Sequence, residues 1–278
     1  MKLLILGGNG MAGHVLVKYF KHQAVHQVFY TTRDSKDQGG LLLDVLDGSM
    51  VDLLIRIVRP AAIINAIGVL NEHAEQKKTD AYWINGLLPH RLVESANRVG
   101  ARVIHISTDC VFSGSRGRYT EIDPPDGTSA YALTKMLGEI HEPGHLTIRT
   151  SIIGPEIRSR AIGLMHWFMQ QSGEVSGYTR VMWNGVTTLE LAKAVDALLN
   201  EQLDGLIHLA APQPISKHDL LVLFKRIWSR DDITIRPEAG VVQDKTLLST
   251  RKDLRYQVPM YETMLQELHD WEMKGGVQ

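Results

Sequence analysis

The chain has 278 residues, of which 44% are apolar, with 30 Lys and Arg side chains against 31 Asp and Glu. This length is enough to bury a large core in one or two domains without disulfides or a structural metal. A net charge of −1 gives no indication of nucleic acid or an anionic membrane as a partner.

The composition also bears on the compartment. The single cysteine, Cys110, has no partner for an internal disulfide, which suits a reducing environment, and the start MKLLILGG is too short an apolar run for a signal peptide. The most apolar stretch, 61–70, is much shorter than the roughly 20 residues of a membrane-spanning helix. The 12 histidines include no HExxH motif. We therefore expect a cytoplasmic protein with no membrane segment and no metal.

Short apolar runs alternate with stretches of helical period in the first half of the chain. This alternation is typical of parallel strands joined by crossover helices. In chain order, we predict a strand at 2–6, a helix at 11–22, a strand at 27–32, a helix at 50–59, a strand at 61–65, a helix at 80–99 that ends at Gly100, and strands at 102–107 and 146–149.

The pattern loosens after residue 150, where Gly154, Pro155 and Gly163 indicate a change of layer. A helix at 188–200 and a strand at 205–210 then return to the main sheet, and Ser216 with Asp219 caps a later helix. No Pro- or Ser-rich linker separates the two parts, so we expect them to interleave.

The predicted fold is therefore α/β, a Rossmann-type doubly wound parallel sheet with a smaller, interleaved C-terminal substrate-binding domain. We expect residues 1–152 to form a dinucleotide-binding domain to which 186–211 return. Residues 153–185 and 212–278 would form the substrate domain.

A GxxGxxG pattern stands directly after the first strand, at the start of the first helix. Glycines in this context permit a tight turn and let a pyrophosphate approach the helix N-terminus. A glycine-rich turn without a ligand is the alternative. We assign to cofactor binding the residues of this turn, Gly7, Asn9, Gly10, Met11 and Gly13.

The end of the second strand bears on which cofactor is bound. It has no acidic side chain for a ribose hydroxyl, whereas Arg33 offers a planar cation to a 2′-phosphate. NADPH is therefore the preferred cofactor and NADH the alternative, while a solvated surface arginine is the other reading of Arg33. Asp44 could accept a hydrogen bond from the adenine amino group, or simply start a turn. The end of the third strand would pack against the cofactor with Asn65, Ala66, Ile67 and Gly68.

Tyr131 and Lys135 are four residues apart and so lie on one face of a predicted helix. A phenol with a pKa of about 10 needs a neighbouring cation before it can serve as a base near neutrality. Thr108, at the end of the fourth strand, could hold a substrate carbonyl at the carboxyl edge of the sheet. YxxxK alone often occurs on solvated helices, but its order after a glycine turn and a strand-end Ser-Thr favours a catalytic set.

These features resemble the extended short-chain dehydrogenase/reductases, and most closely the dTDP-4-dehydrorhamnose reductase family. The likeness runs through LILGGNGMAG, WINGLLPHRLVESAN, VIHISTDCVFSG, SAYALTKMLGE and IRTSIIG. It implies Thr108, Tyr131 and Lys135 as the catalytic set, with Ser107 and Asn85 near the cofactor together with Tyr131 and Lys135. Asn85 could equally be a local cap. It also implies a nucleotide sugar between the lobes, with Arg149 to Ser151 leading to the substrate domain.

Two departures from related families concern the substrate. Sugar-nucleotide dehydratases carry Asp-Glu where this chain has Asp109-Cys110, so a base for elimination of water is missing. The arginine- and proline-rich substrate loop of the reductases is replaced by VVQDKTLLSTRKDL. We take Thr108, Asp109, Lys245 and Arg251 as candidate substrate contacts, although charges near this end of the chain, Lys252 included, are often only solvated.

The expected function is NAD(P)H-dependent reduction of the 4-keto group of a nucleotide-linked 6-deoxy sugar, for cell-surface polysaccharide synthesis. One alternative is an epimerase or dehydrogenase of the same fold. Another is a non-catalytic nucleotide-binding regulatory subunit, because relatives of the family include a regulatory partner of an S-adenosylmethionine-forming enzyme. Family habit adds the expectation of a homodimer.

Overall fold

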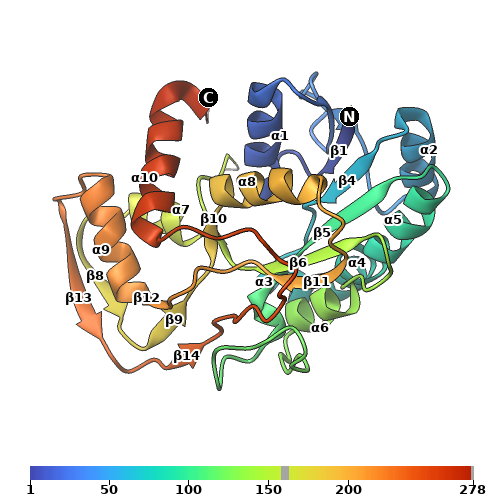
Figure 1. Ribbon diagram of the computed structural model, residues 1–278. Coiled ribbons are helices and arrows are strands. Elements are labelled where there is room, and N and C mark those ends of the chain that lie inside the picture. Colours follow the sequence, from blue (N-terminus) through green and yellow to red (C-terminus); the bar gives the residue numbers. More distant parts are fainter. Residues whose placement is uncertain (158–162, 277–278) are drawn as a thin grey trace.

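A computed structural model describes residues 1–157 and 163–276 of the chain (Figure 1). Residues 158–162 and 277–278, which belong to the expected substrate domain, lie outside the described part. A seven-stranded parallel sheet forms the centre. Its strands in spatial order are β11 (Gly205–His208), β6 (Leu146–Thr150), β5 (Arg102–Thr108), β4 (Ala62–Asn65), β1 (Lys2–Leu6), β2 (Gln27–Thr32) and β3 (Leu41–Leu42).

The central strands β1 and β4 are almost wholly apolar because both faces of the sheet are covered by helices. On β1, Leu3 and Ile5 point into a core that includes α1 (Met11–Gln23) and α8 (Thr188–Leu199). Leu4 and Leu6 point into a second core with α2 (Gly48–Val58) and α5 (Leu88–Asn97). The packing of α8 beside α1 explains how a late segment of the chain completes the first layer (Figure 1).

The strand order reverses between β1 and β4, since the chain runs outward through β2 and β3 and then returns to the other side of β1. In sheets of this kind, ligands bind beyond the carboxyl ends of the strands at such a reversal. The topology therefore points to the loops after β1, β4 and β5. The doubly wound α/β prediction is confirmed by this sheet.

The predicted single helix at 80–99 is wrong in detail. The segment consists of α4 (Lys78–Ala81), a π-helical turn η1 (Tyr82–Leu87) and α5, and it is preceded by α3 (Asn71–Gln76). Pro89 has no N–H to donate to the carbonyl of Asn85, one turn earlier. Gly138 packs directly against that carbonyl, where a side chain would collide with it. The irregular turn thus accommodates a close approach between two segments.

The remaining described elements form a second lobe around small sheets, with β9 between β12 and β14, β8 beside β13, and β7 beside β10. Its buried Phe168 and Phe224 belong to the same core as Leu3 and Ile5 of the main sheet, so one apolar core is continuous through both lobes. The elements are β7 (Ile152–Ile153), α7 (Leu164–Met169), β8 (Gly173–Tyr178), β9 (Val181–Trp183), β10 (Val186–Thr187), β12 (Ile215–Ser216), α9 (Lys217–Ile227), β13 (Ile233–Glu238), β14 (Gln243–Asp244), α10 (Tyr261–Trp271) and η3 (Glu272–Gly276).

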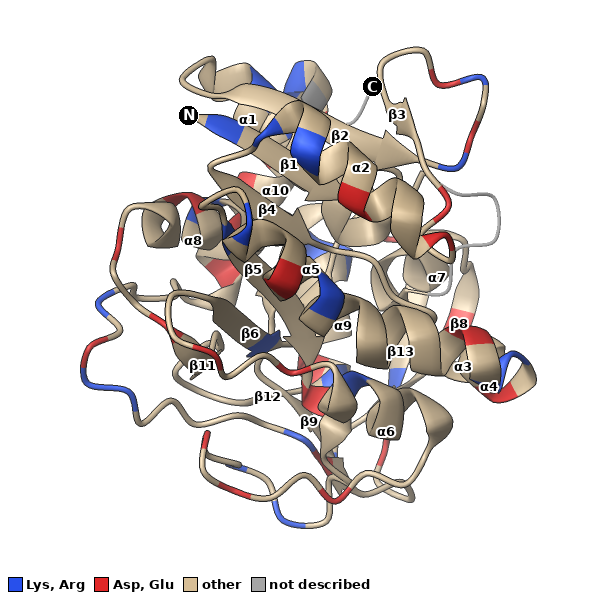
Figure 2. Cartoon of the chain, turned by 90° about the vertical axis from the view of Figure 1, so that its right-hand side faces the viewer, with Lys and Arg blue, Asp and Glu red and all other residues tan. Residues whose placement is uncertain are grey.

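Acidic and basic side chains are interspersed over the helices and loops (Figure 2). Throughout 1–157 and 163–276, no helix combines the length and apolarity needed to cross a membrane.

Gly13 allows α1 to begin directly beside the end of β1. A Cβ atom at this position would collide with the carbonyl oxygen of Gly7, which itself has a left-handed φ of +82°. The nearest neighbours of such a Cβ are the carbonyl oxygen and carbon of Gly7 and the Cα of Gly8. Because all of these atoms belong to the main chain, rotation of a side chain cannot relieve the collision.

We therefore expect Gly13→Ala to destabilise the protein by about 1–3 kcal/mol, through forced displacement of the glycine turn. Gly240→Ala is the matched control, since its nearest neighbour is the end of the Glu238 side chain at 3.8 Å. Thermal unfolding of both variants measures the difference. Equal melting temperatures would show that the close contact carries no strain on substitution.

Candidate active site

A cavity of about 360 Å³ opens at the carboxyl edge of the main sheet, where the strand order reverses between β1 and β4. Its walls come from the loops after β1, β2, β3, β4 and β5, from α6 (Ala130–Leu137), and from the segment after β6. The predicted site residues in its walls are Gly7, Asn9, Gly10, Met11, Arg33, Asp44, Ala66, Ile67, Gly68, Ser107, Thr108, Asp109, Tyr131 and Lys135. This size and composition are those of a small-molecule site.

The glycine turn presents main chain to this cavity. The amide of Gly10 donates to the carbonyl of Gly7 (2.9 Å), and the amide of Gly7 donates to Thr31 Oγ1 (3.1 Å). Gly10 is the N-cap of α1 and offers no side chain to the first amides of the helix. These amides, with the helix dipole, form a site suited to an anionic phosphate.

Arg33 lies exposed on the cavity rim, just past β2. The side chain of Asn9 crosses the turn and donates to Thr32 Oγ1 (3.0 Å) and to Asp37 Oδ2 (3.1 Å). Asp37 also accepts from the hydroxyl of Tyr30 (2.8 Å), and these contacts, against burial, hold its pKa below the usual range. Sequence reasoning missed Asp37 because it stands in a loop, five residues beyond the end of the strand.

Asp44 both lines the cavity and accepts from the amide of Leu46 (3.0 Å), so the two readings of this residue are compatible. Asn65 instead lies wholly buried behind the wall, where its amide contacts His105 Nδ1 (3.0 Å). Its Oδ1 accepts from the amide of Ile67 (3.3 Å), so Asn65 orders the wall from behind.

Thr108 and Tyr131 meet at the end of β5. The Thr108 hydroxyl accepts from the amide of Cys110 (3.1 Å), which starts the short helix η2 (Asp109–Val111), and it lies close enough to the phenol of Tyr131 to act on its pKa. Burial raises the pKa of Tyr131 well above that of a free phenol, with Cys110 and Asp109 acting in the same direction and Thr108 opposing them. Tyr131 is therefore protonated at neutral pH.

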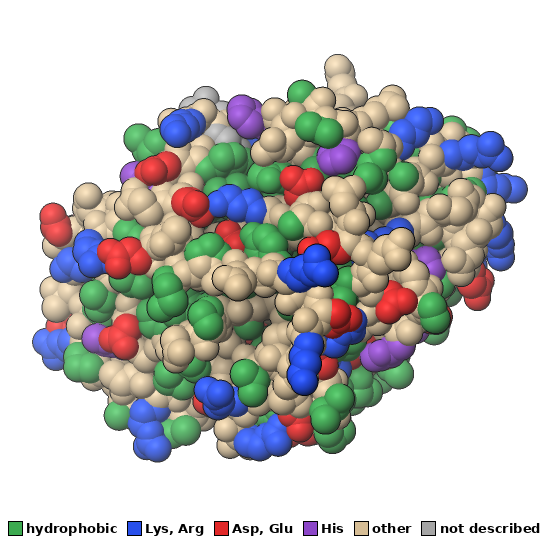
Figure 3. All heavy atoms as spheres, in the orientation of Figure 1, with side chains coloured by type: hydrophobic (Ala, Val, Ile, Leu, Met, Phe, Trp, Pro, Cys, Tyr) green, Lys and Arg blue, Asp and Glu red, His purple; other side chains and the backbone are tan. Residues whose placement is uncertain are grey.

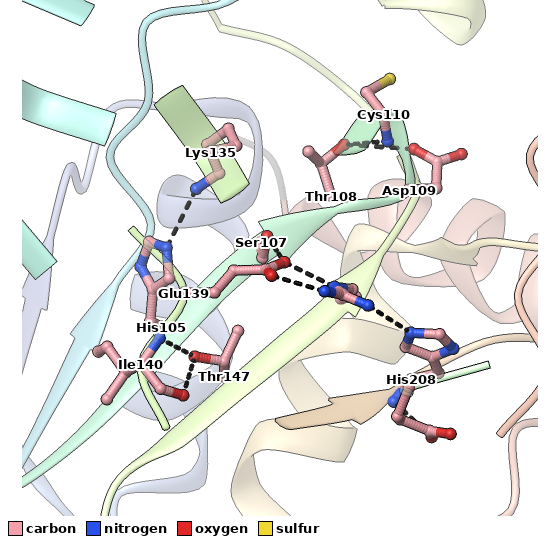
Figure 4. A network of polar contacts seen from close by, with 12 residues as sticks. His105, Ser107, Thr108, Asp109, Cys110, Lys135, Glu139, Ile140, Thr147 and His208 are labelled. Carbon is pink, nitrogen blue, oxygen red and sulfur yellow. Dashed lines mark hydrogen bonds and ion pairs between the residues drawn. The ribbon is translucent and has the colours of Figure 1, made fainter. Parts of the chain in front are cut away.

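Lys135 enters the cavity from α6, one turn after Tyr131, and is only 3% exposed. Its Nζ donates to the carbonyl of Ile106 (2.7 Å). The same Nζ lies 3.3 Å from His105 Nε2, a contact drawn in Figure 4. Burial lowers the pKa of Lys135 to about 8, although Glu139 opposes the shift. The lysine can thus change its charge close to physiological pH.

A buried ion pair joins β6 to the segment that follows α6, near this edge of the sheet. Arg149 donates through Nε and Nη2 to the two carboxylate oxygens of Glu139, both at 2.6 Å, and both residues are less than 5% exposed. Ser107 donates to the same carboxylate (2.8 Å), and His208 lies beyond the guanidinium (Figure 4). Arg149, which we expected only to begin the link to the substrate domain, instead anchors this network.

Asp109 lies where the second lobe meets the cavity. Burial raises the pKa of its carboxyl group, while Lys245, Lys217, Ser151 and Thr108 oppose the shift. Lys217, the first residue of α9, lies 5.1 Å from the ring centre of Trp183, and burial lowers its pKa to about 8. Lys217 belongs to no recognisable sequence motif and was not predicted, since only the tertiary structure brings the start of α9 near Asp109.

The other predicted residues lie outside the cavity wall. Asn85 is buried and clamps the main chain of Val69 through hydrogen bonds of 2.8 and 2.9 Å. Lys245 lies next to Gly114, and its charge acts on Asp109. Arg251 pairs with Asp253 (2.6 Å) and donates to main-chain carbonyls of Asp204 and Leu206, so it ties the late segment to β11. Lys252 is likewise not part of the cavity wall.

The surface offers few further clues. On the face seen in Figure 3, acidic and basic side chains are mixed with apolar ones. Within the described ranges, no three His, Cys, Asp or Glu side chains gather as a metal site would require.

Comparison with known proteins relates most of the chain to one family. The family model described as "RmlD substrate binding domain" matches residues 1–241. The "Spore coat polysaccharide biosynthesis protein SpsK" of Bacillus subtilis is 27% identical over 215 residues, 75% of this chain and 73% of that protein. A dTDP-4-dehydrorhamnose reductase of Burkholderia thailandensis is 33% identical over 160 residues, 54% of this chain and 50% of the reductase. The matched region thus spans about half of that reductase.

A solved structure extends the likeness over the whole fold. The dTDP-4-dehydrorhamnose reductase of Bacillus anthracis, in complex with NADP, superposes with a TM-score of 0.81 at 21% identity. The superposition covers 96% of this chain and 98% of the other. It supports the Rossmann-type assignment of the sheet.

We expect the buried Arg149–Glu139 pair to be essential for stability. Arg149→Met leaves the Glu139 carboxylate buried without its cation and should cost about 3–5 kcal/mol. The control is Arg236→Met, whose ion pair with Glu174 is exposed and should contribute less than about 1 kcal/mol. Urea denaturation of the two variants checks this, and similar losses in both would refute it.

Proposed function

Because this chain belongs to the family of the RmlD substrate binding domain, we propose that it reduces the 4-keto group of a nucleotide-linked 6-deoxy sugar with NADPH. The product would serve cell-surface polysaccharide synthesis in the cytoplasm. The dTDP-4-dehydrorhamnose reductases and the spore coat polysaccharide protein among its relatives support both parts of this assignment.

The glycine turn supports binding of a dinucleotide. Its main chain approaches the cavity where a side chain on Gly10 or Gly13 would crowd the carbonyl of Gly7, and the uncapped start of α1 faces the same space. Gly7, Asn9, Gly10 and Met11 would hold the pyrophosphate there. When bound, the reduced nicotinamide supplies the hydride.

Arg33 supports NADPH over NADH, since a guanidinium on the rim matches a 2′-phosphate. The related reductase structure contains NADP, in agreement with this preference. Asp44, Ala66, Ile67 and Gly68 would complete the adenosine side of the site, with Ser107 nearer the reacting end.

The convergence of Thr108, Tyr131 and Lys135 on one cavity is the observation that carries the proposal. Both hydroxyls would bind the substrate carbonyl oxygen. Tyr131, held protonated by burial, would donate its proton as the alkoxide develops. Lys135 would supply positive charge beside the resulting phenolate.

Asp109 and Lys217 support a sugar site at the junction of the lobes. A buried carboxyl group can accept hydrogen bonds from sugar hydroxyls, and an ammonium group at the start of α9 can donate to oxygens of the same ligand. Lys245 adds a further positive charge near Asp109. The homodimer expected from family habit stays a prediction for sedimentation analysis.

The function is tested by NADPH oxidation against dTDP-, UDP- and GDP-linked 4-keto sugars. We expect turnover with one of these groups. Tyr131→Phe should lower kcat by about 10²–10⁴-fold, because the proton donor is lost. Tyr82→Phe, on the exposed side of η1, should leave kcat unchanged.

Other outcomes of this screen point elsewhere. Full activity of Tyr131→Phe would refute the catalytic assignment. Interconversion of sugar epimers without net NADPH consumption would favour an epimerase. Cofactor binding without any turnover, together with a stable protein partner, would favour a regulatory subunit.

Cofactor preference gives a second prediction. Arg33→Ala should raise the KM for NADPH by about 10–100-fold, because a charged hydrogen bond to phosphate is lost, and leave the KM for NADH nearly unchanged. Arg56→Ala, exposed on α2, is the control. Steady-state kinetics with both cofactors measures this ratio, and equal effects on the two would exclude recognition of the 2′-phosphate by Arg33.

A further inference from the structure

Three buried polar side chains form a row that begins behind the cavity wall and ends in it. The row consists of Asn65 on β4, His105 on β5 and Lys135 on α6. Asn65 and His105 are 0% exposed and are direct neighbours in the register of the sheet. The Asn65 amide lies 3.0 Å from His105 Nδ1, and His105 Nε2 lies 3.3 Å from Lys135 Nζ (Figure 4 shows the second contact). In a buried row of this kind, each donor must face an acceptor.

The main chain determines which way Asn65 points. The amide N–H of Ile67 donates to Asn65 Oδ1 (3.3 Å). This contact turns the Nδ2 group, which can only donate, toward His105 Nδ1.

The orientation of Asn65 determines the tautomer of His105. Because Nδ1 accepts a hydrogen bond, it carries no proton, and a neutral imidazole then carries its proton on Nε2. Burial, together with Lys135 and His90, keeps the pKa of His105 well below the usual value, so the ring is neutral.

The tautomer of His105 in turn acts on Lys135. An ammonium group has three N–H donors and no lone pair, so it cannot accept from Nε2–H. The uncharged amine can accept this hydrogen bond while it still donates to the carbonyl of Ile106 (2.7 Å).

We propose that Asn65 and His105 are positioning residues that stabilise the uncharged form of Lys135, so that the lysine can release its proton during each catalytic cycle. The pair acts through hydrogen-bond geometry, with Ile67 N–H orienting Asn65 and Asn65 selecting the His105 tautomer. Neither residue need touch the substrate.

The charged and titratable groups around the row are compatible with this proposal. Glu139, just after α6, favours the ammonium form of Lys135, but its carboxylate is already paired with Arg149 of β6. His90 on α5 acts on His105 and disfavours imidazolium. Tyr131 on α6 is neutral when protonated. The lowered pKa of Lys135, about 8, agrees with a stabilised amine.

The proposal explains how Tyr131 would recover its proton, and this consequence rests on the proposed function. After Tyr131 protonates the sugar alkoxide, an N–H bond of Lys135 breaks as the O–H bond of Tyr131 forms again. Lys135 is left as an amine that accepts from His105 Nε2–H, and solvent later restores its third proton. The tautomer of His105 can be measured without substrate and without any enzymatic turnover, so its test does not depend on the proposed function.

Nitrogen-15 NMR of the histidine rings tests the tautomer in the full-length wild-type protein. The His105 signals are assigned in the wild-type protein itself, by triple-resonance correlation of the ring with the His105 main chain. We expect a proton on Nε2 and none on Nδ1 from about pH 6 to about pH 9. A proton on Nδ1 in the wild-type protein would overturn the proposal, whether or not any variant folds.

The charge of Lys135 is measured separately by trace acetylation at a series of pH values, with mass spectrometry of the peptide that contains it. Half-maximal reactivity is expected near pH 8, against about 10.4 for an ordinary lysine. A midpoint near the ordinary value would contradict a stabilised amine.

Asn65→Asp reverses the hydrogen bond at His105. A carboxylate still accepts from Ile67 N–H but cannot donate to Nδ1, so the His105 proton should move to Nδ1 and Nε2 should accept from the Lys135 ammonium. We expect the acetylation midpoint of Lys135 to rise by about one pH unit or more.

The double variant Asn65→Asp with His105→Phe separates this effect from the added charge alone. Without the imidazole, most of the rise should disappear. A rise of the same size in the double variant would show that charge acts directly and that His105 transmits nothing. If NMR and acetylation agree with the proposal but no keto sugar is reduced, the proposed function fails while the inference on Lys135 stands.

Discussion

The register of the parallel sheet is the constraint on which the site depends. Leu6 of β1 is level with Asn65 of β4, Asn65 with His105 of β5, and His105 with Thr147 of β6. Because parallel strands present their carboxyl ends to the same edge, the glycine turn, the Ala66 loop and Thr108 reach one rim, although β5 continues three residues beyond His105. A shift of one residue in any of these strands would turn its side chains to the opposite face.

Burial then determines the chemistry that this rim can perform. Taking Tyr131 and Lys135 out of water disfavours the charged form of each, which raises the pKa of the phenol and lowers that of the ammonium group. Because both values start at about 10, they move apart, and transfer of a proton from the Lys135 ammonium group to a Tyr131 phenolate becomes favourable. Glu139 and Arg149 keep their charges inside the protein in a different way. Their opposite charges are paired at 2.6 Å with matched geometry, so both charged forms can persist there.

Much of the site was accessible to sequence reasoning because it follows local rules. Gly7 and Gly10 stand at a strand-to-helix turn, and Tyr131 and Lys135 share one face of a helix by their spacing alone. Reasoning from pattern was less successful where a side chain's partner is distant in sequence. Asn65 lies at the predicted strand end, yet its side chain turns away from the cavity toward His105, and Arg251 is held by the main chain near β11.

The sequence by itself determined the doubly wound fold, the glycine turn and the candidate catalytic residues, since periodicity and short motifs act over a few residues. Only the tertiary structure decided that the charge of Lys217 acts on Asp109, that Glu139 pairs with Arg149, and that His105 stands between Asn65 and Lys135. Each of these contacts joins different secondary-structure elements. Their partners are selected by strand order and by packing between lobes, which no local pattern encodes.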